Sequence, residues 1–201
     1  NIPEARSMRE VVAASEFDQP LSNMYSEQFA ADHPDFRHHF AEFSPSRVPR
    51  MLSRASQIAD MNAPTLEALS EASQIGASEF YQILSEQLQG NYPNTAGLLP
   101  WVFKRPWPVI AIMLADGFGH PTAPYYALKR TYEPTHAALA LPEILWAPGE
   151  QIPLRAKITH AGITALSGHT VQVEVFDPML KSVWKKSLPV SNPAGPSVAQ
   201  A

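Results

Sequence analysis

GLLPWVFKRPWPVIAIML at residues 97–114, followed by DGFGHPTAPYYALKR at residues 116–130, decides the fold of this chain. Residues 97–103 and 109–114 are apolar runs that predict two strands. Pro100 restricts the first of them to an edge, a bulge or a strand with few ladder bonds. The glycines and prolines that follow predict a turn, and residues 125–130 predict a short closing helix.

Two amphipathic helices are predicted before this stretch. Residues 48–59 place apolar side chains at i, i+3, i+4, i+7, i+10 and i+11, and residues 65–89 predict a longer helix that ends at Gly90. The inner face of the longer helix is predicted to carry Leu66, Leu69, Ala72, Phe80, Leu84 and Leu88. Each helix has one apolar face, so each should pack against a sheet. The first forty residues are polar and poorly periodic, and they predict a long excursion with one or two short helices.

From His136 onward the pattern changes to short strands separated by turns. The strand-like runs are residues 137–141, 152–158, 171–176 and 183–188. They predict part of a β-sandwich, because four strands are fewer than the about seven of an immunoglobulin-like domain. The tail at residues 191–197 is turn-forming and is predicted to hold no further strand. We therefore expect two domains, residues 1–134 and 135–201.

Composition excludes several classes of protein. The chain has 201 residues, 17% of them charged, and a net charge of −4. This balance argues against a nucleic-acid-binding protein and against a polybasic membrane-surface protein. The longest apolar run, residues 109–115, is far shorter than the about 20 residues of a membrane span. Without cysteine there is no disulfide, thiolate metal site or cysteine nucleophile, and the compartment stays open between cytoplasmic and periplasmic or secreted.

Over nearly forty residues, the order and spacing from Gly97 to Pro134 resemble the end of the catalytic barrel of glycoside hydrolase family two. The branch most similar is that of β-mannosidases and exo-β-glucosaminidases. Its pattern runs Gly-small-Leu-aromatic-Trp-x-Leu/Phe-Asn-Asp-x-Trp-Pro, then Asp-x-x-Gly-x-Pro-Lys-x-Tyr-Tyr-Ala-Leu-Lys-Arg. The turn at residues 146–150 is similar to the start of the sandwich domain that follows that barrel. The resemblance implies an α/β plus β chain: the terminal βα units of a (β/α)8 TIM barrel followed by part of an immunoglobulin-like β-sandwich.

The same resemblance implies a retaining, exo-acting β-glycosidase that hydrolyses terminal β-linked sugars through a glycosyl-enzyme intermediate. The opening residues 2–9 look like the stretch just after the family's nucleophile motif, so we expect a fragment that is itself inactive. Two carboxylates of this chain are candidates for the nucleophile. Glu16, in Ser-Glu-Phe-Asp, imitates the Ser-Glu-aromatic-Gly motif, and Glu42 is a weaker candidate. The alternative for both is a carboxylate in an exposed turn.

Trp101 is the residue expected to bind the sugar. The resemblance places this tryptophan at the end of the last barrel strand, as the floor of the terminal sugar subsite. An indole offers a flat apolar face to the C–H bonds of a pyranose. The alternative is a tryptophan buried in the barrel. Lys104 and Arg105 stand where the family has Asn-Asp, so they are either substrate-binding residues with an altered preference or a solvated basic loop tip.

No cofactor or metal is expected. His38 and His39 are adjacent and lack the spacing of metal ligands, and residues 117–119 do not form a nucleotide loop. No Ser-His-Asp constellation is supported by spacing alone. The expected partner is a carbohydrate. We also expect self-association, because half a barrel and part of a sandwich each leave an apolar face uncovered.

Two other classes of function stay open. The first is a non-catalytic carbohydrate-binding or interaction module, suggested by the aromatic set Trp101, Trp107, Tyr125 and Tyr126 together with the Lys-Arg pair. The second is a purely structural domain without a ligand. That second class predicts that all four tryptophans are buried.

Overall fold

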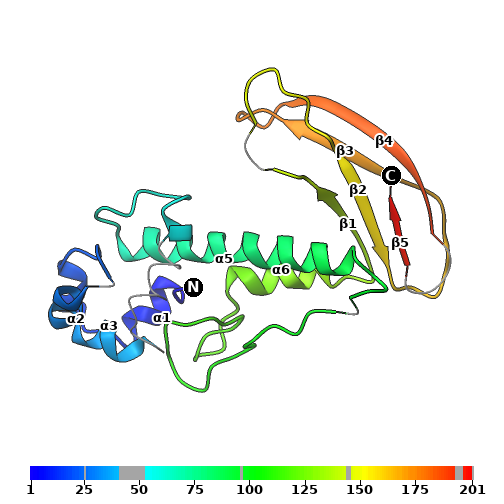
Figure 1. Ribbon diagram of the computed structural model, residues 1–201. Helices are drawn as coiled ribbons and strands as arrows, with labels where there is room; N and C mark the ends of the chain where they lie inside the picture. Colours follow the sequence, from blue (N-terminus) through cyan, green and yellow to red (C-terminus); the bar gives the residue numbers. More distant parts are fainter. Residues whose placement is uncertain (25, 41–52, 96, 144–145, 193–196, 201) are drawn as a thin grey trace. The chain divides into compact units, whose positions relative to one another are not determined.

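The computed structural model describes residues 1–24, 26–40, 53–95, 97–143, 146–192 and 197–200 (Figure 1). The chain divides into two compact units. Unit 1 consists of Asn1–Ile83 and Leu99–Lys129, and unit 2 consists of Leu84–Leu98 and Arg130–Ala201. Two helices, α5 (Leu66–Gln89) and α6 (Ala123–Thr131), contribute residues to both units. No helix in the described part of the chain is long and apolar enough to cross a membrane.

The opening segment of unit 1 folds into more helix than the sequence predicts. In place of one or two short helices it forms α1 (Ala5–Arg9), the 3-10 helix η1 (Ala14–Asp18), α2 (Glu27–Asp32) and α3 (Pro34–His39). Pieces of five or six residues are too short to show a period of 3.6, so local contacts define them instead. For example, the Ser26 hydroxyl accepts a hydrogen bond from Phe29 N at 3.0 Å and begins α2.

Helix α5 confirms the long helix predicted at residues 65–89. Leu66, Leu69 and Ala72 are buried, as predicted. Phe80 is not: it is 41% exposed, and the Arg54 guanidinium lies over its ring at 4.5 Å. Leu84 and Leu88 are half-buried. Most of the other predicted helix, residues 48–59, lies outside the described residues; the helix is seen at residues 53–55, before a turn.

The buried face of α5 is partly polar. The Ser73 hydroxyl accepts a hydrogen bond from Ile2 N at 2.9 Å, and the Ser70 hydroxyl donates one to Pro3 O at 2.6 Å. The Gln74 side chain donates to Ile2 O at 3.1 Å. These bonds satisfy buried polar groups and tie the first residues of the chain to α5. An apolar cluster completes the core of unit 1 and includes Ile2, Met8, Met24, Phe29, Phe36, Leu69 and Ile110.

The prediction of regular strands at residues 97–103 and 109–114 is wrong. Only isolated bridges form there: parallel ones pair Lys104 with Ala115 and Phe40 with Ile110. The prolines at positions 100, 106 and 108 have no N–H to donate, so this part of the chain cannot sustain a ladder. The helix predicted at residues 125–130 is confirmed by α6.

Unit 2 contains the strands predicted after residue 136, and one more. An antiparallel sheet has the order β1-β2-β5, and β3 pairs with β4 in a second sheet. The strands are β1 (Thr135–Ala140), β2 (Arg155–His160), β3 (Leu166–Phe176), β4 (Ser182–Asn192) and β5 (Ser197–Gln200). Strand β5, which begins at the last residue of the turn-forming tail, was not predicted, because its pairing with β2 is not visible in a turn-rich sequence. Ala156 and Ile158 of β2 form one apolar cluster with Val173 and Val190 of the other sheet.

Candidate functional site

Trp101 lies at the surface of unit 1. It is 78% exposed, and its neighbours Leu99 and Phe103 are 96% and 60% exposed. The peptide bond between Trp101 and Val102 is cis. This exposure leaves an indole face free to stack on a ring, which a tryptophan sealed in a core could not do.

Backbone hydrogen bonds hold the segment that carries Trp101. Val102 O accepts a hydrogen bond from Leu114 N at 3.2 Å, and Phe103 O accepts one from Ala115 N at 2.8 Å. The Phe103 ring contacts Tyr125 of α6 edge to face, with 6.2 Å between the ring centroids. The indole is therefore presented from a segment that is fixed on two sides.

Two other aromatic residues of the predicted set are also exposed, whereas Tyr125 is half-buried. Tyr126 is 49% exposed and Trp107 is 39% exposed. Trp184 of unit 2 is 43% exposed. The burial of all four tryptophans expected for a purely structural domain is therefore not seen.

Lys104 and Arg105 follow Trp101 closely on the same segment. Lys104 is exposed, and its Nζ lies 3.8 Å from the position that a Cβ on Gly119 would occupy. Arg105 is half-buried, and its Nε is shielded from solvent without a hydrogen-bond partner. Within the described residues, neither cation forms an ion pair.

A tight turn at residues 116–120 lies next to Lys104. Asp116 is 1% exposed; its Oδ1 accepts hydrogen bonds from Phe118 N at 3.0 Å and His120 N at 2.8 Å. Its Oδ2 accepts one from the Ser7 hydroxyl at 2.6 Å. Gly119 has φ of +91°, a conformation that favours glycine. Asp116 thus organises the turn and links it to α1.

Ser7, Asp116 and His120 form a cluster that sequence reasoning missed. The Ser7 Oγ lies 3.0 Å from His120 Nδ1, and the same nitrogen lies 3.5 Å from Asp116 Oδ2. In a catalytic triad the serine and the carboxylate use opposite nitrogens of the histidine, and the serine gives its proton to that histidine. Here the Ser7 proton goes to Asp116, so the cluster is a structural link. The one sequence signal for this cluster is Asp-Gly-x-Gly at residues 116–119, which predicts the turn but not its contact with Ser7.

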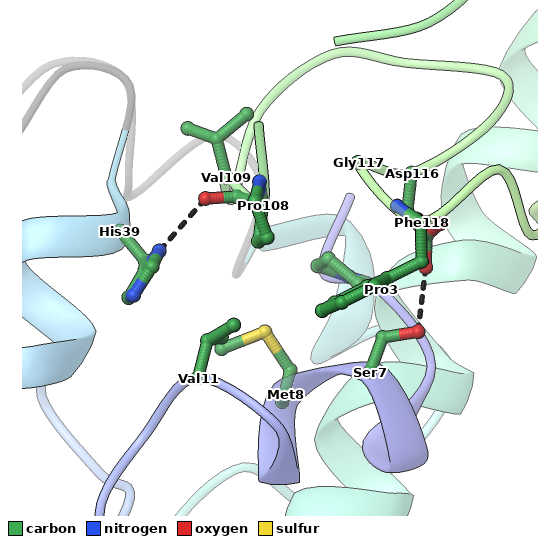
Figure 2. A pocket seen from close by; sticks show the side chains of 10 residues that line it. All are labelled: Pro3, Ser7, Met8, Val11, His39, Pro108, Val109, Asp116, Gly117 and Phe118. Atoms are coloured by element: carbon green, nitrogen blue, oxygen red, sulfur yellow. Dashed lines mark hydrogen bonds between the residues drawn. The ribbon is translucent and has the colours of Figure 1, made fainter. Parts of the chain in front are cut away.

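A shallow hollow lies between α1, His39 and this turn (Figure 2). It is lined by Pro3, Ser7, Met8, Val11, His39, Pro108, Val109, Asp116, Gly117 and Phe118. A Cβ on Gly117 would lie 2.4 Å from Pro108 N, which shows how closely the two loops approach. The hollow is too narrow to hold a water molecule, so it is not a sugar pocket.

Glu16 is not an exposed turn carboxylate. It is 5% exposed, and its two oxygens accept hydrogen bonds from Asp35 N at 2.8 Å and Phe36 N at 3.1 Å. These are free N–H groups at the start of α3, which a carboxylate stabilises. Asp35 reciprocates, because its Oδ2 accepts a hydrogen bond from Ala13 N at 2.8 Å. Glu42, the other candidate, lies outside the described residues.

The adjacent histidines lie against an indole. His39 and His38 contact Trp107 with ring centroids 5.3 Å and 5.5 Å away, and His39 Nδ1 lies 2.7 Å from Pro108 O (Figure 2). Across the described ranges, no group of three His, Cys, Asp or Glu side chains is placed to hold a metal ion.

The fold of this chain is that of a segment of glycoside hydrolases of family two. It superposes over 100% of its length on 22% of exo-chitosanase CsxA from Amycolatopsis orientalis, with a TM-score of 0.74 and 18% identity. The β-mannosidase from Dictyoglomus thermophilum gives a TM-score of 0.69 at 15% identity, again over 100% of this chain and 22% of that one. No protein-family model matches the chain, and no curated protein matches it in sequence. The resemblance expected from the sequence is thus confirmed at the level of the fold.

Proposed function

We propose that residues 1–134 are the terminal βα units of a TIM barrel of a family-two glycoside hydrolase, and that residues 135–201 begin an immunoglobulin-like β-sandwich. Three observations support this. The parallel bridges at Ala115 and Ile110 are the pairing that barrel strands use. The two sheets of unit 2 share an apolar layer, as the sheets of a sandwich do. The chain also spans 22% of the length of both enzymes named above.

The activity that we propose is that of a retaining, exo-acting β-glycosidase, with β-mannosidase as the nearest type. Such an enzyme needs two carboxyl groups about 5–5.5 Å apart, one of them a nucleophile. Glu16 is occupied by the backbone of α3 and is not free to attack a sugar. Residues 2–9 resemble the stretch that follows the nucleophile motif in the family, so we propose that both catalytic carboxyl groups belong to polypeptide outside this chain.

The exposed indole of Trp101 is the observation that carries this proposal. Backbone hydrogen bonds of residues 102 and 103 hold the segment that carries it, and Trp101 is 78% exposed. A pyranose stacked on it would keep water away from the bond that is cleaved. Trp101 therefore acts as one wall of the sugar subsite rather than as a catalytic group.

Hydrolysis tests the assignment of the carboxyl groups. The chain should not turn over p-nitrophenyl β-mannoside, β-glucosaminide or β-galactoside, because it lacks the nucleophile and the acid. Turnover that disappears in Glu16→Gln would contradict this and would make Glu16 the nucleophile.

Sugar binding tests the role of Trp101. Titration with methyl β-mannoside should change the tryptophan fluorescence. The dissociation constant should be about millimolar, because this chain supplies only one side of the proposed sugar subsite. The change should be lost in Trp101→Ala and kept in Trp184→Ala, which removes an exposed tryptophan from β4. Equal responses of the two variants would contradict the proposal.

A second candidate is a non-catalytic carbohydrate-binding module. It is favoured by the row of exposed apolar side chains at Leu99, Trp101 and Phe103, since such a row can hold a saccharide without any catalytic group. The same titration separates the two candidates. A module is complete in itself and should bind with a dissociation constant of about micromolar.

A further inference from the structure

The segment that presents Trp101 is largely uncovered by the rest of the protein. Leu99 is 96% exposed and Trp101 is 78% exposed. With so little side-chain packing, the order of this stretch depends on the hydrogen bonds of its backbone. On its C-terminal side, the carbonyl groups of residues 102–103 accept hydrogen bonds from the backbone N–H groups of residues 114–115. The bonds on its N-terminal side therefore decide how freely the indole can move.

Tyr132 supplies the bond on the N-terminal side. Its hydroxyl donates a hydrogen bond to Leu98 O at 2.6 Å, three residues before Trp101. This distance is within the range of a well-formed O–H···O hydrogen bond. Within the described ranges it is the one hydrogen bond that residues 97–101 make. The backbone around Trp101 is thus held on both sides, and on one side by a single hydroxyl.

Tyr132 is itself held in place through its neighbour Thr131, the last residue of α6, which is 0% exposed. The Thr131 hydroxyl lies 2.8 Å from the Ser85 hydroxyl of α5. Thr131 O accepts a hydrogen bond from Gln89 Nε2 at 2.8 Å. These contacts and the bond to Leu98 all lie within unit 2. The Tyr132 hydroxyl therefore connects the backbone of Leu98 to a fixed pair of helices.

We propose that Tyr132 is a positioning residue for sugar binding, which restricts the backbone before Trp101 so that the indole is ordered before a sugar stacks on it. This rests on the proposed sugar-binding role of Trp101 and adds a residue on which that role depends. A ligand that binds a mobile segment must order it, and the lost conformational entropy weakens the affinity. A hydrogen bond already present in the free protein removes part of that cost. Tyr132 acts only through the backbone and does not itself touch the sugar.

Removal of the hydroxyl alone tests this proposal. Tyr132→Phe keeps the ring and deletes the donor, so the dissociation constant for methyl β-mannoside, measured by tryptophan fluorescence, should rise about threefold or more. Tyr92→Phe is the matched control, because Tyr92 is 43% exposed, against 46% for Tyr132, and its hydroxyl makes no hydrogen bond within the described residues. The control should keep the affinity within about 1.5-fold. Equal urea midpoints of unfolding would separate positioning from a general loss of structure.

A measurement without sugar follows the segment itself. Time-resolved fluorescence anisotropy reports the local rotation of tryptophan side chains on the nanosecond scale. Tyr132→Phe should increase the amplitude of fast rotation, and the increase should disappear when Trp101 is also replaced, in Trp101→Phe/Tyr132→Phe. Tyr92→Phe should leave the amplitude unchanged. A residue that only stabilised unit 2 would not act on Trp101 in particular.

The outcomes separate the two proposals. If Trp101→Ala abolishes binding but Tyr132→Phe binds like the unchanged protein, the positioning role is overturned and the sugar-binding role stands. If Tyr132→Phe and Tyr92→Phe lose affinity alike, the effect does not come from the bond to Leu98, and the positioning role is again overturned. If Trp101→Ala leaves the response to sugar unchanged, the proposed function itself fails, and the positioning role fails with it.

Discussion

Two buried carboxylates of unit 1 accept hydrogen bonds from backbone N–H groups. Glu16 accepts two N–H groups of α3, and Asp116 accepts two N–H groups of its own turn. In each case the negative charge is held by donors that would otherwise be unsatisfied. Neither side chain is free to react, so the catalytic carboxyl groups of the proposed reaction must be sought elsewhere.

The role of Glu16 gives a prediction about stability. Glu16→Gln sets an NH2 group against a backbone N–H of α3, so the free energy of unfolding should fall by about 1–3 kcal/mol. Glu71→Gln, at an exposed position of α5, should change it by less than about 0.5 kcal/mol. Urea unfolding measures both. Equal stabilities of the two variants would show that Glu16 does not hold α3.

At the scale of the element, α5 is the framework of unit 1. Its buried side carries Leu66 and Leu69 together with serines that bind the first residues of the chain. The helix has apolar residues on more than one side, so its sequence alone leaves the buried face ambiguous toward its end. Phe80 lies outside that face: its ring is 41% exposed and contacts the Arg54 guanidinium and the Tyr81 ring.

This orientation predicts unequal effects of two truncations. Leu69→Ala should lower the free energy of unfolding by about 2–5 kcal/mol, because Leu69 is fully buried and its loss leaves a cavity. Phe80→Ala should cost less than about 1.5 kcal/mol, because the ring is 41% exposed. Thermal and urea unfolding of the two variants provide the measurement. If Phe80→Ala lowered the free energy of unfolding more than Leu69→Ala, Phe80 would lie on the inner face, as the sequence predicted.

At the scale of the whole molecule, unit 2 exposes much apolar surface. Ile163, Met179 and Leu180 are 94%, 86% and 83% exposed, and Val183 of β4 is 60% exposed. Surfaces of this kind favour contacts between protein molecules. Among the described residues the sheet β3-β4 has two strands, so each strand has one unpaired edge.

We expect this surface to bind a second copy of the chain. Sedimentation velocity at increasing concentration should show a dimer or larger species, and Val183→Lys should weaken it. Ser187→Lys adds the same charge to β4 without removing apolar surface and should have a smaller effect. A monodisperse monomer at all concentrations would refute self-association.

Local patterns account for the part of the structure that could be predicted. The period of α5, the alternation along β2 and β3, and the spacing around Trp101 all depend on residues close in sequence. One or two of the four short helices before residue 40 were predicted and strand β5 was not, because these elements depend on caps and on pairing with distant strands. The strands expected at residues 97–103 and 109–114 do not form, because the prolines in this stretch have no backbone N–H to donate to a sheet.

The sequence by itself determined the long helix, the four strands of unit 2 that it predicts and the family-like order of residues around Trp101, since periodicity and spacing are local properties. The tertiary structure decided that Trp101 is exposed, that Glu16 binds α3 and that Ser7 meets Asp116 across 109 positions. Those outcomes depend on which distant segments meet, and no local pattern encodes that. Within the described residues Lys104 and Arg105 form no ion pair, and this is decided in the same way, because ion pairing depends on folded distances.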